Sequence, residues 1–340
     1  MGDSTRRSLA GRRSVLLGMV GLASTALAAC TTNGNGTATS TASVLVEAGP
    51  ATPPPAIAEL SREEEAAALA LRKADPGGAA GLDANSGETA GGVDAGGGAP
   101  PSNASLPPSR QQILAEFGTL RPKEWGLHVT GVVDSSPARH VALTFDACGG
   151  PGGAGCDQKL LNTLRSLKVP ATLFVNSRWI SANPLLAADL AAEPLFELAN
   201  HGTRHLPLSV SGRAAYGIPG TASAGDVYDE LTGNQAVLHS LTGKWPRFFR
   251  PGTAYYDDVA AAMTRRLGML PVNFTINGDG GATYAPPTVA AEVGKAKAGD
   301  IVISHFNRPA SGTAEGYAKV LPRLLDGGVT FAQLGQVLPA

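Results

Sequence analysis

Short apolar segments typical of β-strands alternate with segments of helical spacing from about residue 140 to the end of the chain. Val141, Leu143 and Phe145 alternate with smaller residues, as in a strand with one face on a core, and Leu160 and Leu164 follow at helical spacing. Strands separated by helices are typical of parallel sheets with helical crossovers. The chain is therefore expected to adopt an α/β fold.

About seven βα units follow one another, and we expect their sheet to close into a barrel. The expected strands are 140–145, 171–175, 196–199, 248–249, 270–276, 301–305 and 329–334. The expected helices are 160–167, 185–192, 226–241, 257–267, 289–296 and 317–326. Together they predict one folded domain over residues 111–340, which is long enough to bury a large core.

The first thirty residues have the pattern of an export signal. Arg12 and Arg13 precede an apolar run over residues 15–29, which is short for a membrane span but suits a signal peptide of the twin-arginine type. Cys30 follows Leu-Ala-Ala, as in the box where a bacterial lipoprotein is cleaved and lipidated. The alternative is an ordinary signal peptide cut after Ala29. Both place the mature protein outside the cytoplasm, and the first anchors it to the outer face of the cell membrane.

Residues 31–110 have the composition of a disordered linker. Small polar residues, prolines and glycines dominate, apart from a short charged helix expected over residues 59–74. The net charge of the whole chain is −1, and no basic cluster follows the signal segment. This charge distribution argues against a nucleic acid as partner.

Polar side chains follow four of the expected strands. Asp146 ends the first, His201 and His205 follow the third, Arg250 follows the fourth, and His305 ends another. Taken singly, each has an ordinary explanation: a turn cap, a core histidine or a surface salt bridge. The carboxyl ends of parallel strands meet at one edge of a sheet, where ligands bind. We therefore expect these residues to form one active site.

In these motifs and their order, residues 137–334 resemble the polysaccharide deacetylase family of metal-dependent carbohydrate esterases. Thr144-Phe145-Asp146 matches the motif of the general base, and Arg250-Pro251 matches the motif that positions this base. The resemblance implies that His201 and His205 bind the metal and that His305 is the general acid. Asn277 or Asp279 lies where the family places the aspartate that tunes this histidine. The implied fold is a distorted (β/α) barrel.

The resemblance also implies the reaction. A divalent ion, zinc foremost and cobalt as an alternative, polarises an acetyl carbonyl, and Asp146 takes a proton from the attacking water. The implied enzyme is a hydrolase of carbon–nitrogen bonds other than peptide bonds. It would remove acetyl groups, most often N-acetyl, from a cell-wall or related polysaccharide.

One position departs from the family motif, which has a second aspartate as third metal ligand where this chain has Ala147. Three replacements are open: Asp146 itself, Asp157 beyond the following loop, or an oxygen of substrate or water, with Asp146 ranked first. Without a third ligand, the domain is a degenerate member that binds glycan or scaffolds other wall enzymes. A solute-binding lipoprotein would need two lobes, and the chain provides one domain.

Two further sequence features bear on the same site. Cys148 and Cys156 flank a glycine-rich loop, and in an exported protein we expect them to form a disulfide. The alternative is a free thiol at Cys148 that compensates for Ala147 as a metal ligand. Gly252-Thr253 follows Arg250-Pro251 where many relatives have Pro-Tyr, and Tyr255 or Tyr256 is the candidate to replace that wall of the substrate site.

Overall fold

The structure, a computed structural model, describes residues 107–338. The predictions for the signal peptide, the lipidation of Cys30, and the linker with its helix over residues 59–74 lie outside the described residues. Within residues 107–338, no helix combines the length and the apolar character needed to cross a membrane.

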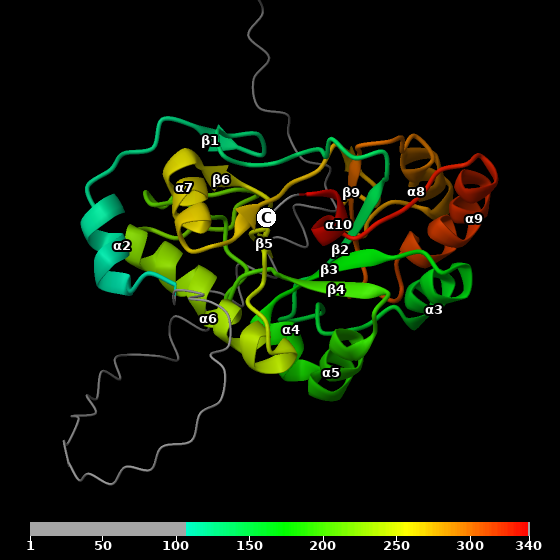
Figure 1. Ribbon diagram of the computed structural model, residues 1–340, viewed down its shortest axis with the longest axis horizontal. Helices are drawn as coiled ribbons and strands as arrows, with labels where there is room; N and C mark the ends of the chain where they lie inside the picture. Colours follow the sequence, from blue (N-terminus) through cyan, green and yellow to red (C-terminus); the bar gives the residue numbers. More distant parts are fainter. Residues whose placement is uncertain (1–106, 339–340) are drawn as a thin grey trace, which may run out of the picture. The chain divides into compact units, whose positions relative to one another are not determined.

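Seven parallel strands form the central sheet, in the order β7-β5-β4-β3-β2-β9-β8 (Figure 1). This arrangement confirms the predicted α/β class. The strands are β2 (Ala142–Ala147), β3 (Ala171–Val175), β4 (Phe196–Asn200), β5 (Phe248–Phe249), β7 (Leu270–Pro271), β8 (Ile276–Asn277) and β9 (Ile301–His305). A separate antiparallel pair, β1 (Trp125–Gly126) and β6 (Tyr256–Asp257), was not expected from the sequence.

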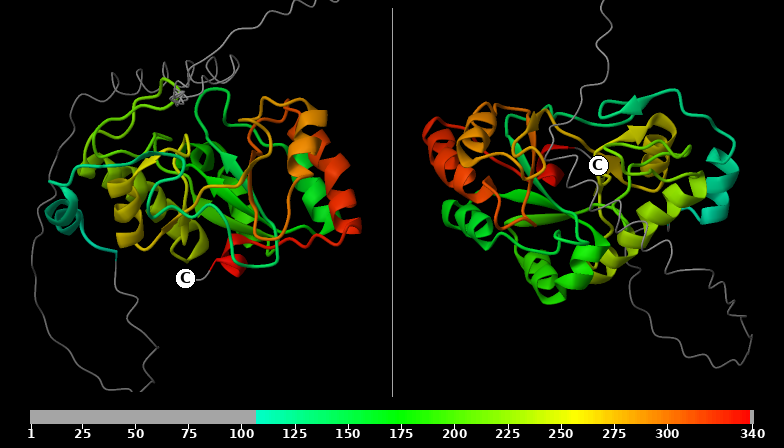
Figure 2. Two further views of the ribbon diagram at one scale, coloured as in Figure 1. Left: turned by 90° about the horizontal axis from the view of Figure 1, so that it is seen from above. Right: turned by 180° about the vertical axis from the view of Figure 1, so that it is seen from behind.

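Helices follow most strands, as the alternation predicts. They are α2 (Arg110–Phe117), α3 (Gln158–Leu167), α4 (Ser177–Ala182), α5 (Pro184–Ala192), α6 (Ala224–Thr242), α7 (Asp258–Arg266), α8 (Pro286–Val293), α9 (Thr313–Asp326) and α10 (Leu334–Val337). In both views of Figure 2, α8 and α9 lie together at one end of the domain and α2 and α7 at the other.

Buried apolar side chains cover both faces of the sheet. Phe145 and Leu173 of the central strands pack with Leu160 of α3 and Tyr317 of α9 in the largest cluster. On the opposite face, Ala142, Phe174 and Ile301 form a second cluster with Leu334 of α10, so this short helix closes the interior of the curled sheet. The alternation in β2 therefore sends odd-numbered residues to the helices and even-numbered residues to the interior.

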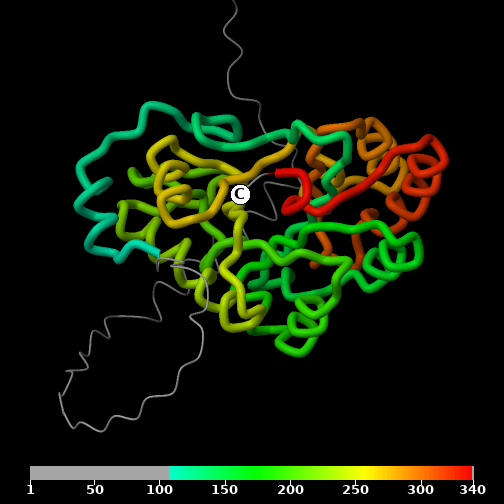
Figure 3. Tube along the Cα trace, in the orientation of Figure 1, coloured from blue at the N-terminus to red at the C-terminus, as the bar shows by residue number. Residues whose placement is uncertain are grey.

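The stretch 270–276 is not the single strand that the sequence predicts. Leu270–Pro271 pairs with β5 at one edge of the sheet, and Ile276–Asn277 pairs with β9 at the other edge. Only residues 272–275 separate these edges in the chain, so the sheet must curl until its edges approach each other. Figure 3 shows how the trace of this stretch runs from one half of the domain to the other. The result is a curled half-barrel, a distorted form of the predicted barrel.

The strand predicted over residues 329–334 is also wrong. Only Phe331 of this stretch forms a bridge, to Val141, and the chain then enters α10. Apolar residues in 329–334 suggested a strand, but Val329 and Phe331 pack against the cluster on the helix-covered face, and Ala332 and Leu334 pack in the interior cluster. Propensity alone does not distinguish these two ways of burying apolar surface.

Candidate active site

Asp146 and Arg250 form a buried ion pair inside the curled sheet. Nη1 of Arg250 donates to Oδ1 of Asp146 at 2.8 Å and to Oγ1 of Thr144 at 2.9 Å. Its Nε and Nη2 donate to the carbonyl oxygens of Val272 and Asn273 at 3.2 and 3.0 Å. The guanidinium thus joins β2 to the stretch that links the two edges of the sheet, and it fixes the direction of the Asp146 carboxylate.

His305 lies beside Asp146, because the two residues are register partners on the adjacent strands β9 and β2. Its Nδ1 lies 3.0 Å from Oδ1 of the fully buried Asp279, whose Oδ2 accepts the backbone N–H of His305 and the hydroxyl of Thr313. Burial alone would lower the pKa of His305, but the charge and hydrogen bond of Asp279, with a smaller contribution from Cys148, hold it well above its usual value. Of the two candidates for the histidine's partner, the structure places Asp279 there, while Asn277 accepts a bond from Gly280.

His201 and His205 follow β4 and pack edge to face, with ring centroids 4.8 Å apart. Nδ1 of His201 lies 2.8 Å from the carbonyl oxygen of Arg250. Since a carbonyl only accepts, Nδ1 carries a proton, and whenever the ring is neutral Nε2 is the lone-pair nitrogen. His205 adopts a left-handed backbone with φ +64°, and a Cβ on Gly252 would overlap its carbonyl oxygen, so the glycine of the Arg-Pro-Gly motif allows this close approach.

Glu230 is a buried residue of the site that sequence reasoning missed. Its carboxylate, 1% exposed, accepts the backbone N–H groups of Arg204, His205 and Leu206 at 2.9–3.3 Å. These bonds hold the turn that presents His205. A glutamate in the middle of a helical pattern carries no local signal of this role, because its partners lie some 25 residues earlier in the chain.

The predicted disulfide is wrong: Cys148 and Cys156 are both free. The sulfur of Cys148 points into the site, 4.0 Å from Nε2 of His201, whereas the sulfur of Cys156 accepts a hydrogen bond from Gln158 at the start of α3. Backbone hydrogen bonds within residues 149–153 already close the loop between them. Closeness in sequence therefore did not bring the two sulfurs together.

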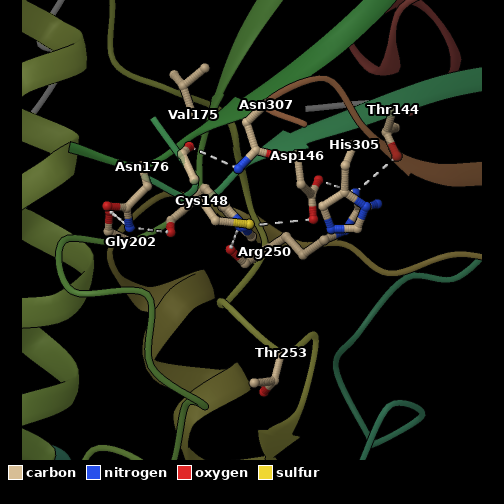
Figure 4. A network of polar contacts seen from close by, with 12 residues as sticks. Thr144, Asp146, Cys148, Val175, Asn176, Gly202, Arg250, Thr253, His305 and Asn307 are labelled. Carbon is tan, nitrogen blue, oxygen red and sulfur yellow. Dashed lines mark hydrogen bonds and ion pairs between the residues drawn. The ribbon is translucent and has the colours of Figure 1, made fainter. Parts of the chain in front are cut away.

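The two thiols also differ in acidity. Burial raises the pKa of Cys148, but the charge of His205 and hydrogen bonds with His201, His205 and His305 outweigh it and lower this pKa well below its usual value. Burial and the neighbouring Asp157 raise the pKa of Cys156 to about 11. Figure 4 shows Cys148 at the end of β2, near Asp146 and His305.

Cys148, His201 and His205 are the one group in residues 107–338 whose ligand atoms could together hold a metal ion. The three atoms lie within 4.8 Å of one another, and all three residues are buried. Three nitrogen and sulfur donors with an open side are typical of catalytic zinc sites, so these residues suit a divalent ion. Asp146 is outside the group, although its Oδ2 lies 3.7 Å from Nε2 of His201.

The other residues proposed to replace the missing aspartate or tyrosine, Asp157, Tyr255 and Tyr256, do not line the pocket. Asp157 caps α3, where its Oδ1 accepts the N–H of Leu160 at 3.1 Å. Tyr256 is fully buried and donates to the carbonyl of Phe249. Tyr255 is half-buried and contacts the ring of Trp125, with centroids 5.6 Å apart.

A pocket with a cavity volume of about 140 Å³ opens to solvent above these groups. Asp146, Cys148, His205 and His305 line its floor, and Tyr216 is part of its wall. Tyr216, Tyr255 and Trp125 form a continuous row of rings, because Tyr216 and Tyr255 are 5.4 Å apart. Of these three rings, only Tyr216 is part of the pocket wall, and the guanidinium of Arg213 lies over the ring of Trp125, 5.3 Å from its centroid. Rings so distant in the chain could not be assigned together from sequence.

Comparisons with known proteins agree with this architecture. Among solved structures, a carbohydrate esterase family 4 pseudoenzyme from Bacillus anthracis is similar with a TM-score of 0.52 at 20% identity, over 62% of this chain and 70% of that one. A peptidoglycan N-acetylglucosamine deacetylase is similar with a TM-score of 0.51 at 20% identity, over 61% and 92%. The chain therefore has the fold of carbohydrate esterase family 4.

Sequence comparison defines the family more closely. Residues 134–272 match the family described as polysaccharide deacetylase. A chitooligosaccharide deacetylase from Bradyrhizobium sp. (strain ANU 289) is 28% identical over 178 residues, which cover 52% of this chain and 74% of the relative. Residues 134–272 therefore belong to the polysaccharide deacetylase family. The family match ends before Asp279 and His305, so the assignment of these two residues depends on their geometry.

Proposed function

We propose that this domain hydrolyses acetyl groups, N-acetyl foremost, from a cell-wall or related polysaccharide with the help of a divalent metal ion. One observation carries the proposal. A carboxylate held by a buried arginine, Asp146, and a histidine held by a buried carboxylate, His305, are register partners at the floor of the same pocket. A base and an acid so placed suit acyl transfer to water.

Asp146 serves as the general base in this proposal. Arg250 occupies its Oδ1, so Oδ2 remains to accept a proton from the attacking water. The paired guanidinium is itself fully buried. Arg250 acts as a positioning residue, because every donor it uses is directed to protein atoms.

His305 serves as the general acid. Its Nδ1–H is directed to Asp279, which leaves Nε2 as the atom that delivers a proton to the departing amine. The raised pKa of His305 keeps the ring protonated near neutral pH, as proton delivery requires. An amine that leaves without this proton is a very poor leaving group.

His201 and His205 hold the divalent ion, with zinc or cobalt favoured by their imidazole nitrogens. When bound, such an ion supplies a Lewis acid that polarises the acetyl carbonyl and acidifies water. The lone-pair Nε2 of His201 supports this assignment, because the Arg250 carbonyl fixes the ring in the tautomer that a metal ligand needs.

The substrate is a glycan that contains N-acetylglucosamine. The named activities of the chitooligosaccharide and peptidoglycan deacetylases to which the chain is similar support this choice. So does Tyr216 in the pocket wall, since an aromatic ring can pack on the apolar face of a sugar ring. Acetate release from chitooligosaccharide, peptidoglycan and acetylated xylan, compared at equal acetyl concentration, ranks the candidates.

The proposal places the enzyme at the outer face of the cell membrane, with a lipid on Cys30 and residues 31–110 as a tether to the wall. The sequence pattern around Arg12-Arg13 and Cys30 supports it. Replacement of Cys30 by serine should then move the protein from the membrane fraction to the soluble fraction. Retention of the variant in membranes would contradict the anchor.

The test of the activity uses the full chain before and after chelation. Chelation should abolish acetate release, and zinc or cobalt should restore it. Asp146→Asn and His305→Gln should each lower kcat by at least about 10²-fold, whereas Asp189→Asn on α5 and His239→Gln on α6 should leave it unchanged. A folded protein that releases no acetate from any of the three substrates would instead favour a glycan-binding role.

A further inference from the structure

The site contains a ligand set that the family motif does not predict. The Sγ atom of Cys148 lies 4.0 Å from Nε2 of His201, and His205 completes a buried group within 4.8 Å. Tetrahedral zinc with one sulfur and two nitrogens requires S···N separations of about 3.5 Å. The separation between Cys148 and His201 exceeds this value by about half an ångström, and the other separations in the group are at most 4.8 Å, so the three side chains must move closer together when an ion binds.

The strand geometry explains why Cys148, and not residue 147, supplies the donor. Ala147 is fully buried in the cluster that contains Phe145, on the helix-covered face of the sheet. Successive side chains of a strand point to opposite faces, so the residue after Ala147 returns to the side of Asp146. The step from Asp146 in β2 to Cys148 directly after the strand therefore places a base and then a thiol toward the same pocket.

The surroundings hold the Cys148 backbone in place. Nη2 of Arg178 donates to its carbonyl oxygen at 3.1 Å, and Asn176 in turn anchors Arg178. Gly149 follows with φ +68°, and a Cβ there would lie 2.5 Å from the backbone nitrogen of Trp179. The chain thus turns away directly after Cys148 against the start of α4, which leaves its sulfur at the floor of the pocket.

We propose that the thiolate of Cys148 is the third ligand of the divalent ion held by His201 and His205, in the role that a carboxylate plays in the family motif. The inference rests on the proposed metal-dependent function. On metal binding, the thiol loses its proton to solvent and the sulfur lone pair forms the bond to the ion. Asp146 then keeps both its Arg250 contact and its role as base.

A thiolate donor changes which ion the site prefers. Sulfur ligands favour zinc, and cobalt with it, whereas a carboxylate suits harder ions such as magnesium and manganese. The wild-type chain should therefore bind zinc and cobalt in the presence of excess magnesium or manganese. Replacement of Cys148 by aspartate should weaken this preference and increase relative affinity for manganese.

Cobalt(II) titration of the full chain tests the ligand directly, because a cobalt–thiolate bond gives a charge-transfer absorption in the near ultraviolet. We expect this band in the wild type and in Cys156→Ser, the matched control for a thiol outside the site. Cys148→Ser should lose the band and bind cobalt at least about tenfold more weakly. Cys148→Asp should bind cobalt without the band, and its circular dichroism shows whether loss of the band reflects unfolding.

The outcomes distinguish this inference from the proposed function. Bound cobalt with chelator-sensitive acetate release but no thiolate band in the wild type would overturn the ligand role of Cys148 and leave the deacetylase intact. A band that persists in Cys148→Ser or disappears in Cys156→Ser would also overturn it. Absence of cobalt binding altogether would refute the inference together with the metal dependence of the proposed function.

Discussion

Arg250→Lys tests whether one buried side chain both holds the curled sheet closed and orients the carboxylate of Asp146, the proposed base. Lysine keeps the charge and reaches Asp146, but a single ammonium group does not also reach the carbonyls of Val272 and Asn273. Each buried acceptor left without a donor costs about 1–3 kcal/mol. The free energy of unfolding should therefore fall by about 2–6 kcal/mol.

Urea unfolding followed by circular dichroism measures this loss, with Arg247→Lys as the matched control. Arg247 lies on the other side of β5, is half-buried, and donates to two carbonyls at 3.2 Å near the end of the described chain. Its replacement should cost no more than about 1 kcal/mol. The Arg250 variant should also lose about 10²-fold in kcat/KM, because the carboxylate of Asp146 shifts. Equal unfolding midpoints for both variants would refute the argument.

Three further changes address the groups around the pocket. Asp279→Asn removes the charge that raises the pKa of His305, so the fall of kcat with rising pH should move to lower pH; an unmoved pH profile would contradict His305 as the acid. Glu230→Gln weakens the hydrogen bonds to the turn that presents His205, so zinc affinity should fall about 10–100-fold. Competition with a chelating dye measures this affinity, and Glu292→Gln on the surface is the control. Gly252→Ala introduces a Cβ against the carbonyl of His205, so it should lower kcat while a Gly243→Ala control, where the added Cβ meets no atom within 4 Å, does not.

The strands and the site residues at their ends could be anticipated because both depend on local pattern. The predicted strand 171–175 coincides with β3, and the predicted strand 301–305 coincides with β9. Parallel strands share one carboxyl edge, so residues at strand ends converge whatever the order of strands in the sheet. This rule predicts from sequence that Asp146, Arg250 and His305 lie close together.

The features that escaped prediction depend on contacts between distant parts of the chain. The division of 270–276 between opposite edges follows from how far the sheet curls, which no window of sequence contains. The direction of the Cys148 sulfur depends on Arg178 and on the approach of α4, some 30 residues later. The short spacing of Cys148 and Cys156 and the expected export of the protein favoured a disulfide. Neither feature carries information about the direction of a side chain.

The parallel pairing of β2 with β9 separates the chemistry of this domain from its choice of substrate. Asp146 and His305 are neighbours across a hydrogen-bonded strand pair, so the spacing of their backbones is fixed near 4.8 Å by the sheet itself. Much of the pocket wall belongs instead to segments outside the seven-stranded sheet, around Trp125, Tyr216 and Tyr255. Exchange of these segments between relatives should redirect the enzyme to other acetylated glycans while the proton-transfer pair stays unaltered, which makes the domain a suitable framework for engineering deacetylation patterns.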